Sequence, residues 1–150
     1  MKYLKSGKKN TFVNELNNES CVDCNILVAC LSSRSPYHNI YRSLVAGKFD
    51  LVVSQDILLE YEEIIQIKYG LKTSHSLLTL LALLSNVYYV HPFYKWNLID
   101  ADPDDNKYCD WAVSGTADYI VTEDNHFNVL TDVPFPSIAT ITIDDFLKIV

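Results

Sequence analysis

The chain has 150 residues, of which 49% are hydrophobic and only four are glycine, so it is long enough and apolar enough to fold as one globular domain. This composition excludes an intrinsically disordered chain. The formal net charge of −7 argues against broad electrostatic capture of nucleic acid. The charge is uneven, because the first ten residues carry +4 and leave −11 for the remainder.

No secretory signal or membrane-spanning segment is visible in the sequence. Its basic start is followed by polar residues rather than by an apolar signal sequence, and the longest apolar run, Leu77–Leu84, is too short to span a bilayer. We therefore expect a soluble cytoplasmic protein with no membrane partner. In that compartment the four cysteines are expected as buried thiols rather than disulfides, and the Cys21/Cys24 pair lacks a second pair to complete a zinc site.

Taken in chain order, residues 1–19 read as a polar, basic N-terminal extension containing at most a short helix, and residues 20–150 as a single domain. Apolar runs of strand length predict five strands, at Ser20–Asp23, Phe49–Val53, Val87–Val90, Tyr119–Thr122 and Ser137–Ile141. Helical periodicity and capping residues predict helices at Asn25–Leu31, Tyr37–Gly47, Gln55–Lys68, Thr73–Ser85, Asp104–Gly115 and Thr142–Val150. This alternation predicts a three-layer α/β/α fold, with a central parallel sheet of about five strands flanked by helices.

Acidic residues are concentrated between Asp100 and Asp105, where four carboxylates fall within six residues. Acids are favoured in the first turn of a helix, which accounts for part of this cluster without any function. In a helix that begins near Asp104, however, Asp105 shares a small apolar stripe with Cys109 and Ala112, so it is expected to face inward, whereas Asp110 is expected to face water. Glu60 similarly lies within the apolar stripe of its predicted helix.

Four of the acidic residues follow four different predicted strands. Asp23 ends the first strand, and Glu60, Asp105 and Asp124 come after the next three. Because the carboxyl ends of parallel strands lie along one edge of a sheet, these carboxylates are expected to meet there. Converging carboxylates repel one another unless a cation lies among them, and Mg²⁺ prefers oxygen ligands. The pattern therefore predicts a divalent-metal site.

Four motifs in this order resemble those of PIN-domain nucleases. They are Val22–Val28 (VDCNILV), Ser54–Tyr61 (SQDILLEY), Asp102–Lys107 (DPDDNK) and Ala117–Asp124 (ADYIVTED). Each motif alone is weakly specific. The four together, in order and with sensible spacing over residues 20–150, are a strong signal. The similarity extends to the bacterial toxin branch of toxin–antitoxin pairs, the relatives of VapC.

The resemblance implies a PIN-like fold and a ribonuclease that hydrolyses RNA phosphodiester bonds with metal-activated water. It makes Asp23, Glu60, Asp105 and Asp124 both the catalytic residues and the ligands of one or two Mg²⁺ or Mn²⁺ ions. The implied supporting residues are Asn25, Asp102, Asp104 and Thr122. It also implies an RNA substrate and an antitoxin protein as partners. Cys24 departs from the family pattern, in which a small polar residue is common.

Basic residues that could hold substrate phosphates are Arg34, Arg42, Lys48, Lys95 and Lys107. The leucine-rich helix and the aromatic loop 91–99 are compatible with a homodimer. His126 lies near the expected site, and we interpret it as a substrate-contacting or structural residue, because metal-activated water needs no separate base.

Other functions fit the same acidic edge. The main alternative is a PIN-fold module that binds RNA or protein and regulates without cutting. A haloacid-dehalogenase-type phosphatase needs a second aspartate where Asn25 stands, and a receiver domain usually has an adjacent acid where Cys24 stands. Neither of these two enzymes therefore matches well.

Overall fold

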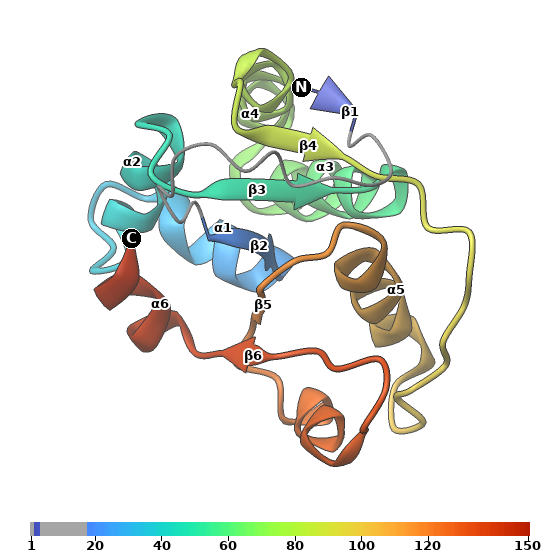
Figure 1. Ribbon diagram of the computed structural model, residues 1–150. Coiled ribbons are helices and arrows are strands. Elements are labelled where there is room, and N and C mark those ends of the chain that lie inside the picture. The colour runs from blue at the N-terminus through green and yellow to red at the C-terminus, as the bar shows by residue number, and fades with distance from the viewer. Residues whose placement is uncertain (1, 4–17) are drawn as a thin grey trace, which may run out of the picture.

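A six-stranded parallel sheet forms the centre of the computed structural model, which describes residues 2–3 and 18–150 (Figure 1). The strand order is β1-β4-β3-β2-β5-β6, and every neighbouring pair runs parallel. The strands are β1 (Lys2–Tyr3), β2 (Glu19–Val22), β3 (Asp50–Val53), β4 (Val87–Tyr89), β5 (Tyr119–Val121) and β6 (Thr140–Ile141). All five predicted strands are present, and the PIN-like α/β fold is confirmed.

Helices flank this sheet and connect its strands. They are α1 (Cys24–Leu31), α2 (His38–Val45), α3 (Gln55–Tyr69), α4 (Leu71–Leu83), α5 (Asn106–Ser114) and α6 (Ile143–Ile149), with 3₁₀ helices η1 (Pro103–Asp105) and η2 (Asn125–Asp132). Helix α5 packs on β2, β3 and β5, whereas α1 contacts both α2 and α3, and α3 contacts α4. Figure 1 shows α2 near the start of β3 and α5 beyond its end.

Two residues of the predicted N-terminal extension lie in the sheet. Lys2 and Tyr3 form β1, which pairs with Tyr88 and Tyr89 at one edge of the sheet, and β2 begins at Glu19 rather than Ser20. The short helix considered for residues 1–19 falls mainly on residues 4–17, which lie outside the described part of the chain. Among the described residues, no helix is long and apolar enough to cross a membrane.

The boundary between α3 and α4 differs from the predicted one. Gly70, with φ of +86°, ends α3 and directly precedes α4, so α4 begins at Leu71 instead of being capped by Thr73. Thr73 lies inside α4, where its hydroxyl donates a hydrogen bond to the Tyr69 carbonyl. The predicted cap at Ser54 is confirmed, since its hydroxyl accepts a hydrogen bond from the Ile57 N–H.

The core lies between the sheet and its covering helices, and β3 is buried along its whole length. The carboxyl end of α5 lies close to β3, where Gly115 packs against Val52. A Cβ added at Gly115 would lie 2.5 Å from Val52 Cγ1, so only glycine fits without a shift. This contact helps to hold α5, and with it η1, against the carboxyl edge of the sheet.

The expectation that Asp110 faces water is wrong. Asp110 is buried, and its Oδ1 accepts a hydrogen bond of 2.8 Å from the Trp96 N–H. The loop 91–99 covers the face of α5 that the helical pattern assigned to solvent. The inward positions of Cys109 and Ala112 are confirmed.

Candidate active site at the carboxyl edge of the sheet

The register of the sheet brings Asp23 beside Thr122. Strand β2 pairs with β5 so that Val22 faces Val121, and the next residue of each strand lies at the carboxyl edge. Thr122 Oγ1 donates a hydrogen bond of 2.8 Å to Asp23 Oδ2 and accepts one of 3.1 Å from the Asp124 N–H. Asp23 also caps α1, because its Oδ1 accepts a 2.9 Å hydrogen bond from the Asn25 N–H. These bonds fix the orientation of a buried carboxylate.

Glu60 reaches the same edge from α3 and has two partners on α5. Its Oε1 accepts a hydrogen bond of 2.7 Å from the Tyr108 hydroxyl, and its Oε2 lies 2.5 Å from Lys107 Nζ. The Tyr108 hydroxyl accepts a hydrogen bond from the Cys24 N–H, next to Asp23. On the same turn of α3, the hydroxyl of Tyr61 donates to the Val22 carbonyl. Glu60 is therefore held near the end of β2, with Lys107 neutralising its charge.

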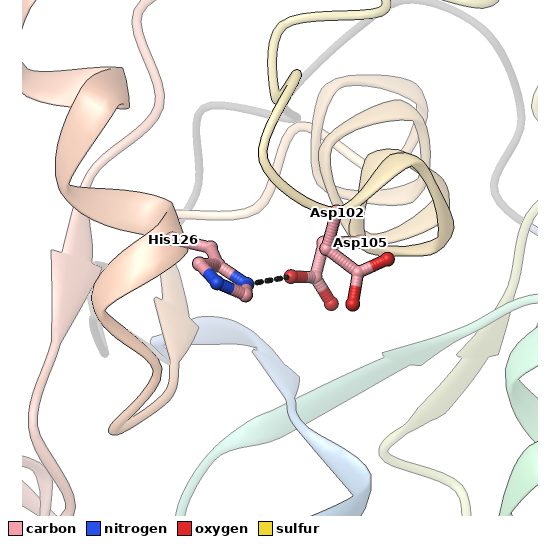
Figure 2. Close-up of side chains that lie close together, drawn as sticks. All are labelled: Asp102, Asp105 and His126. Atoms are coloured by element: carbon pink, nitrogen blue, oxygen red, sulfur yellow. Dashed lines mark hydrogen bonds and ion pairs between the residues drawn. The ribbon is translucent and has the colours of Figure 1, made fainter.

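Asp102, Asp105 and His126 form a third group, drawn in Figure 2. One ligand atom from each lies within 4.8 Å of the others. His126 Nδ1 is 3.1 Å from Asp105 Oδ2 and 3.4 Å from Asp124 Oδ1. Asp102 caps η1 by accepting a hydrogen bond from the Asp104 N–H, and Asp124 caps η2 by accepting one from the His126 N–H. Both capped turns thus face each other across the edge.

The pKa values of the carboxyl groups reflect this crowding. Burial raises the pKa of Asp23; hydrogen bonds from Asn25 and Thr122 oppose the rise, and the charges of Glu60 and Asp105 add to it. Burial likewise raises the pKa of Asp105, against the hydrogen bond from His126, and the charges of Asp102 and Asp124 raise it further. The edge therefore holds more negative charge than its own residues neutralise.

Two basic side chains partly offset that charge. The hydrogen bond to Asp105 raises the pKa of His126 above its ordinary value, against the opposite effect of burial. For Lys107, burial lowers the pKa, but the hydrogen bond and charge of Glu60 outweigh it, so the pKa is raised overall. Lys107 is therefore the internal counter-charge of the site, and His126 adds a second positive charge whenever its imidazole is protonated.

The donor set fits a divalent cation. Ligand atoms around one octahedral ion at about 2.1 Å are roughly 3 to 4 Å apart, so donor atoms within 4.8 Å need only small side-chain movements to share one ion. Asp102, Asp105 and His126 supply two carboxylate oxygens and one imidazole nitrogen. Asp124 contacts this group through His126, and Thr122 is hydrogen-bonded to both Asp124 and Asp23.

The sequence profile of the PIN domain matches residues 19–126, which include every one of these acids. The chain belongs to the PIN-domain family. Members of this family are nucleases, and they generally use divalent metal ions. Comparison with curated proteins gives no match.

The PIN fold of this chain is similar to that of a chain in the crystal structure of VapBC2 from Rickettsia felis bound to a DNA fragment from their promoter. The TM-score is 0.54 at 16% sequence identity, and the alignment covers 83% of this chain and 98% of that chain. At this identity the similarity establishes the fold.

The structure brings Asp23, Glu60, Asp105 and Asp124 to one edge of the PIN domain, as the strand pattern predicted. They are not equivalent there. The cluster of converging ligand atoms contains Asp105 but has Asp102 and His126 as its other members, and Glu60 is ion-paired with Lys107. Of the expected supporting residues, Thr122 contributes its side chain, whereas Asn25 and Asp104 contribute backbone N–H groups.

The basic residues expected to hold phosphates are divided between two places. Lys95 and Lys107 line a cavity of about 280 Å³ beside the acidic edge. Arg42 and Lys48 do not reach that edge, because they line a different cavity, between α2 and the C-terminal helix. Arg34 follows α1, an eight-residue helix about 12 Å long that starts at the edge, so it also lies at the far end.

The sequence does not indicate the contacts of Tyr108, and it indicates the position of His126 only weakly. Tyr108 pairs with a residue 48 positions earlier, and no local pattern indicates that contact. His126 did carry a signal, since it lies two residues after Asp124, where an N-cap carboxylate binds the N–H of the second following residue.

Proposed function

We propose that this PIN-domain protein is a metal-dependent endoribonuclease that hydrolyses RNA phosphodiester bonds and acts in the cytoplasm as the toxin of a toxin–antitoxin pair. The observation that carries the proposal is the pair of aspartates, Asp23 and Asp105, at the carboxyl edge of the sheet. The pKa of each is raised by burial and by neighbouring acids. Such crowding is costly unless a cation binds among the carboxylates.

In this proposal Asp23, Asp105 and Asp124 hold one or two Mg²⁺ or Mn²⁺ ions, with Asp102 beside them. Thr122 keeps Asp23 oriented through its 2.8 Å hydrogen bond. Glu60 completes the acidic edge, and its ion-pair partner Lys107 binds a substrate phosphate in this proposal. A bound divalent ion supplies a Lewis acid for the phosphodiester and activates the attacking water.

The aromatic loop 91–99 supports single-stranded RNA as the substrate class. Phe93 is 95% exposed and Tyr94 is 65% exposed, and both line the cavity that also contains Lys95 and Lys107. Exposed rings stack on unpaired bases, while lysine ammonium groups bind the backbone phosphates. Asp110 holds this loop in place through the Trp96 N–H.

The proposal of an antitoxin partner is supported by exposed apolar side chains on α3 and α4. Leu59, Ile67, Leu71 and Leu83 are all at least half exposed. Leu59 and Ile67 line one hollow on α3, and adjoining exposed apolar side chains are typical of protein–protein contact. A structure with the same fold comes from VapBC2, which is described as bound to promoter DNA. The other partner that we propose is a second copy of this chain, bound through the same helices. Light scattering tests whether such a homodimer forms.

Cleavage of labelled single-stranded RNA by the purified full chain, with Mg²⁺, Mn²⁺ or EDTA, tests the activity. We expect cleavage only with metal. We expect Asp23→Asn and Asp105→Asn to lower the rate at least about 100-fold, since bound metal contributes several kcal/mol to such reactions. Asp132→Asn, an exposed acid at the end of η2, is the matched control and should cleave like the wild type.

Equal cleavage by the wild type and both aspartate variants would refute the assignment, because it would identify a contaminating ribonuclease. RNA binding without cleavage under any metal would instead favour the regulatory module that does not cut.

A further inference from the structure

The imidazole of His126 lies directly against the carboxylates of the acidic edge. Its Nδ1 points at Asp105 Oδ2, 3.1 Å away, and one of its ring nitrogens lies within 4.8 Å of a carboxylate oxygen of Asp102 (Figure 2). Asp105 is the last residue of η1 and Asp102 is its N-cap, whereas the histidine belongs to η2. Donor atoms from two separately capped turns therefore converge on one point.

The fold fixes this direction through the backbone. Asp124 caps η2 by accepting a 2.9 Å hydrogen bond from the His126 N–H, and the Asp124 N–H is in turn bound by Thr122. The imidazole therefore starts from an anchored main-chain position beside β5. The side chain is 42% exposed, so the ring has room to make the adjustment that a shared ion requires.

We propose that His126 Nδ1, once it has released its proton to solvent, is a direct ligand, together with Asp105 and Asp102, in a mixed nitrogen and oxygen site that prefers Mn²⁺ to Mg²⁺. This inference rests on the proposed metal-dependent function and specifies its metal. Mg²⁺ favours oxygen ligands almost exclusively, whereas imidazole nitrogen is a good ligand for transition metals. An all-carboxylate site would bind both ions through oxygen and would lack this source of preference.

The competing explanation is that His126 only orients Asp105 by a hydrogen bond and never contacts the metal. Both roles would weaken metal binding when His126 is replaced, so affinity alone does not separate them. A nitrogen bound directly to Mn²⁺ does, because the ¹⁴N nucleus then modulates the pulsed electron paramagnetic resonance signal of the ion.

The test uses the full chain, stripped of metal with EDTA and titrated with Mn²⁺ or Mg²⁺. His126→Gln removes the imidazole and keeps a polar side chain. His75→Gln is the matched control, because His75 also faces a carboxylate, with its Nε2 4.0 Å from Glu62 Oε1, but lies on α4. Circular dichroism verifies that each variant is folded.

We expect ¹⁴N modulation from bound Mn²⁺ in the wild type and in His75→Gln, and its loss in His126→Gln. Calorimetric titration should show Mn²⁺ binding weakened about tenfold or more in His126→Gln, with Mg²⁺ binding changed less than about threefold. Absence of nitrogen modulation in the wild type, its persistence in His126→Gln, or failure of Mn²⁺ to bind would overturn the inference.

The outcome is separable from that of the ribonuclease assay. Nitrogen-coordinated Mn²⁺ in a protein that cuts no RNA would support the metal site and refute the nuclease. RNA cleavage with Mg²⁺ or Mn²⁺ but no nitrogen coupling would support the nuclease and refute the role of His126.

Discussion

Removing the hydroxyl of Tyr108 tests whether the site is held together by the contact between α5 and α3. That hydroxyl donates a 2.7 Å hydrogen bond to Glu60 Oε1 and accepts one of 3.3 Å from the Cys24 N–H, and the side chain is buried. A hydrogen bond to a charged group contributes about 1.5–3 kcal/mol. We therefore expect Tyr108→Phe to lower the free energy of unfolding by about 2 kcal/mol, and Tm by about 4–8 °C.

Urea unfolding followed by circular dichroism measures the loss, without metal. Tyr94→Phe is the control, because the Tyr94 ring packs on Trp96 at the surface and is 65% exposed; its cost should stay below about 0.5 kcal/mol. In a double-mutant cycle with Glu60→Gln, the coupling free energy should be about 1–2 kcal/mol. If Tyr108→Phe is as stable as the control, the hydrogen-bond bridge does not hold the two helices together.

Two further substitutions test the packing behind the site. Gly115→Ala should lower the free energy of unfolding by about 1–3 kcal/mol, because its Cβ would lie 2.5 Å from Val52 Cγ1. Urea unfolding measures this loss, and adding Val52→Ala should restore part of it. If the effects of the two substitutions simply add, the steric explanation is wrong. Asp110→Asn should stabilise the protein at pH 7, since it keeps an acceptor for Trp96 but removes a buried charge. Burial raises the pKa of Asp110, so the charge penalty fades as pH falls through that raised pKa, and the stability gap should close on acidification; a gap independent of pH would refute this.

Local patterns in the sequence were sufficient to predict the fold and the convergence of the acidic residues at one edge of the sheet. Apolar runs alternating with amphipathic helices specify a parallel sheet, and a parallel sheet collects the residues after its strands along one edge. Asp23, Glu60, Asp105 and Asp124 each lie in the segment that follows a strand, so the topology brings these four segments to that edge. The family motifs pointed to the same residues.

The pairing of these acids with other side chains was decided only by the tertiary structure. Glu60 meets Tyr108 across 48 residues, and Asp105 meets His126 across 21, so both contacts depend on how helices cross and which rotamers they adopt. The burial of Asp110 is also decided by the tertiary structure. Its helical position indicates a solvent-facing residue, yet the loop 91–99 covers it, because helical periodicity describes one packed face and cannot reveal what a distant loop will cover.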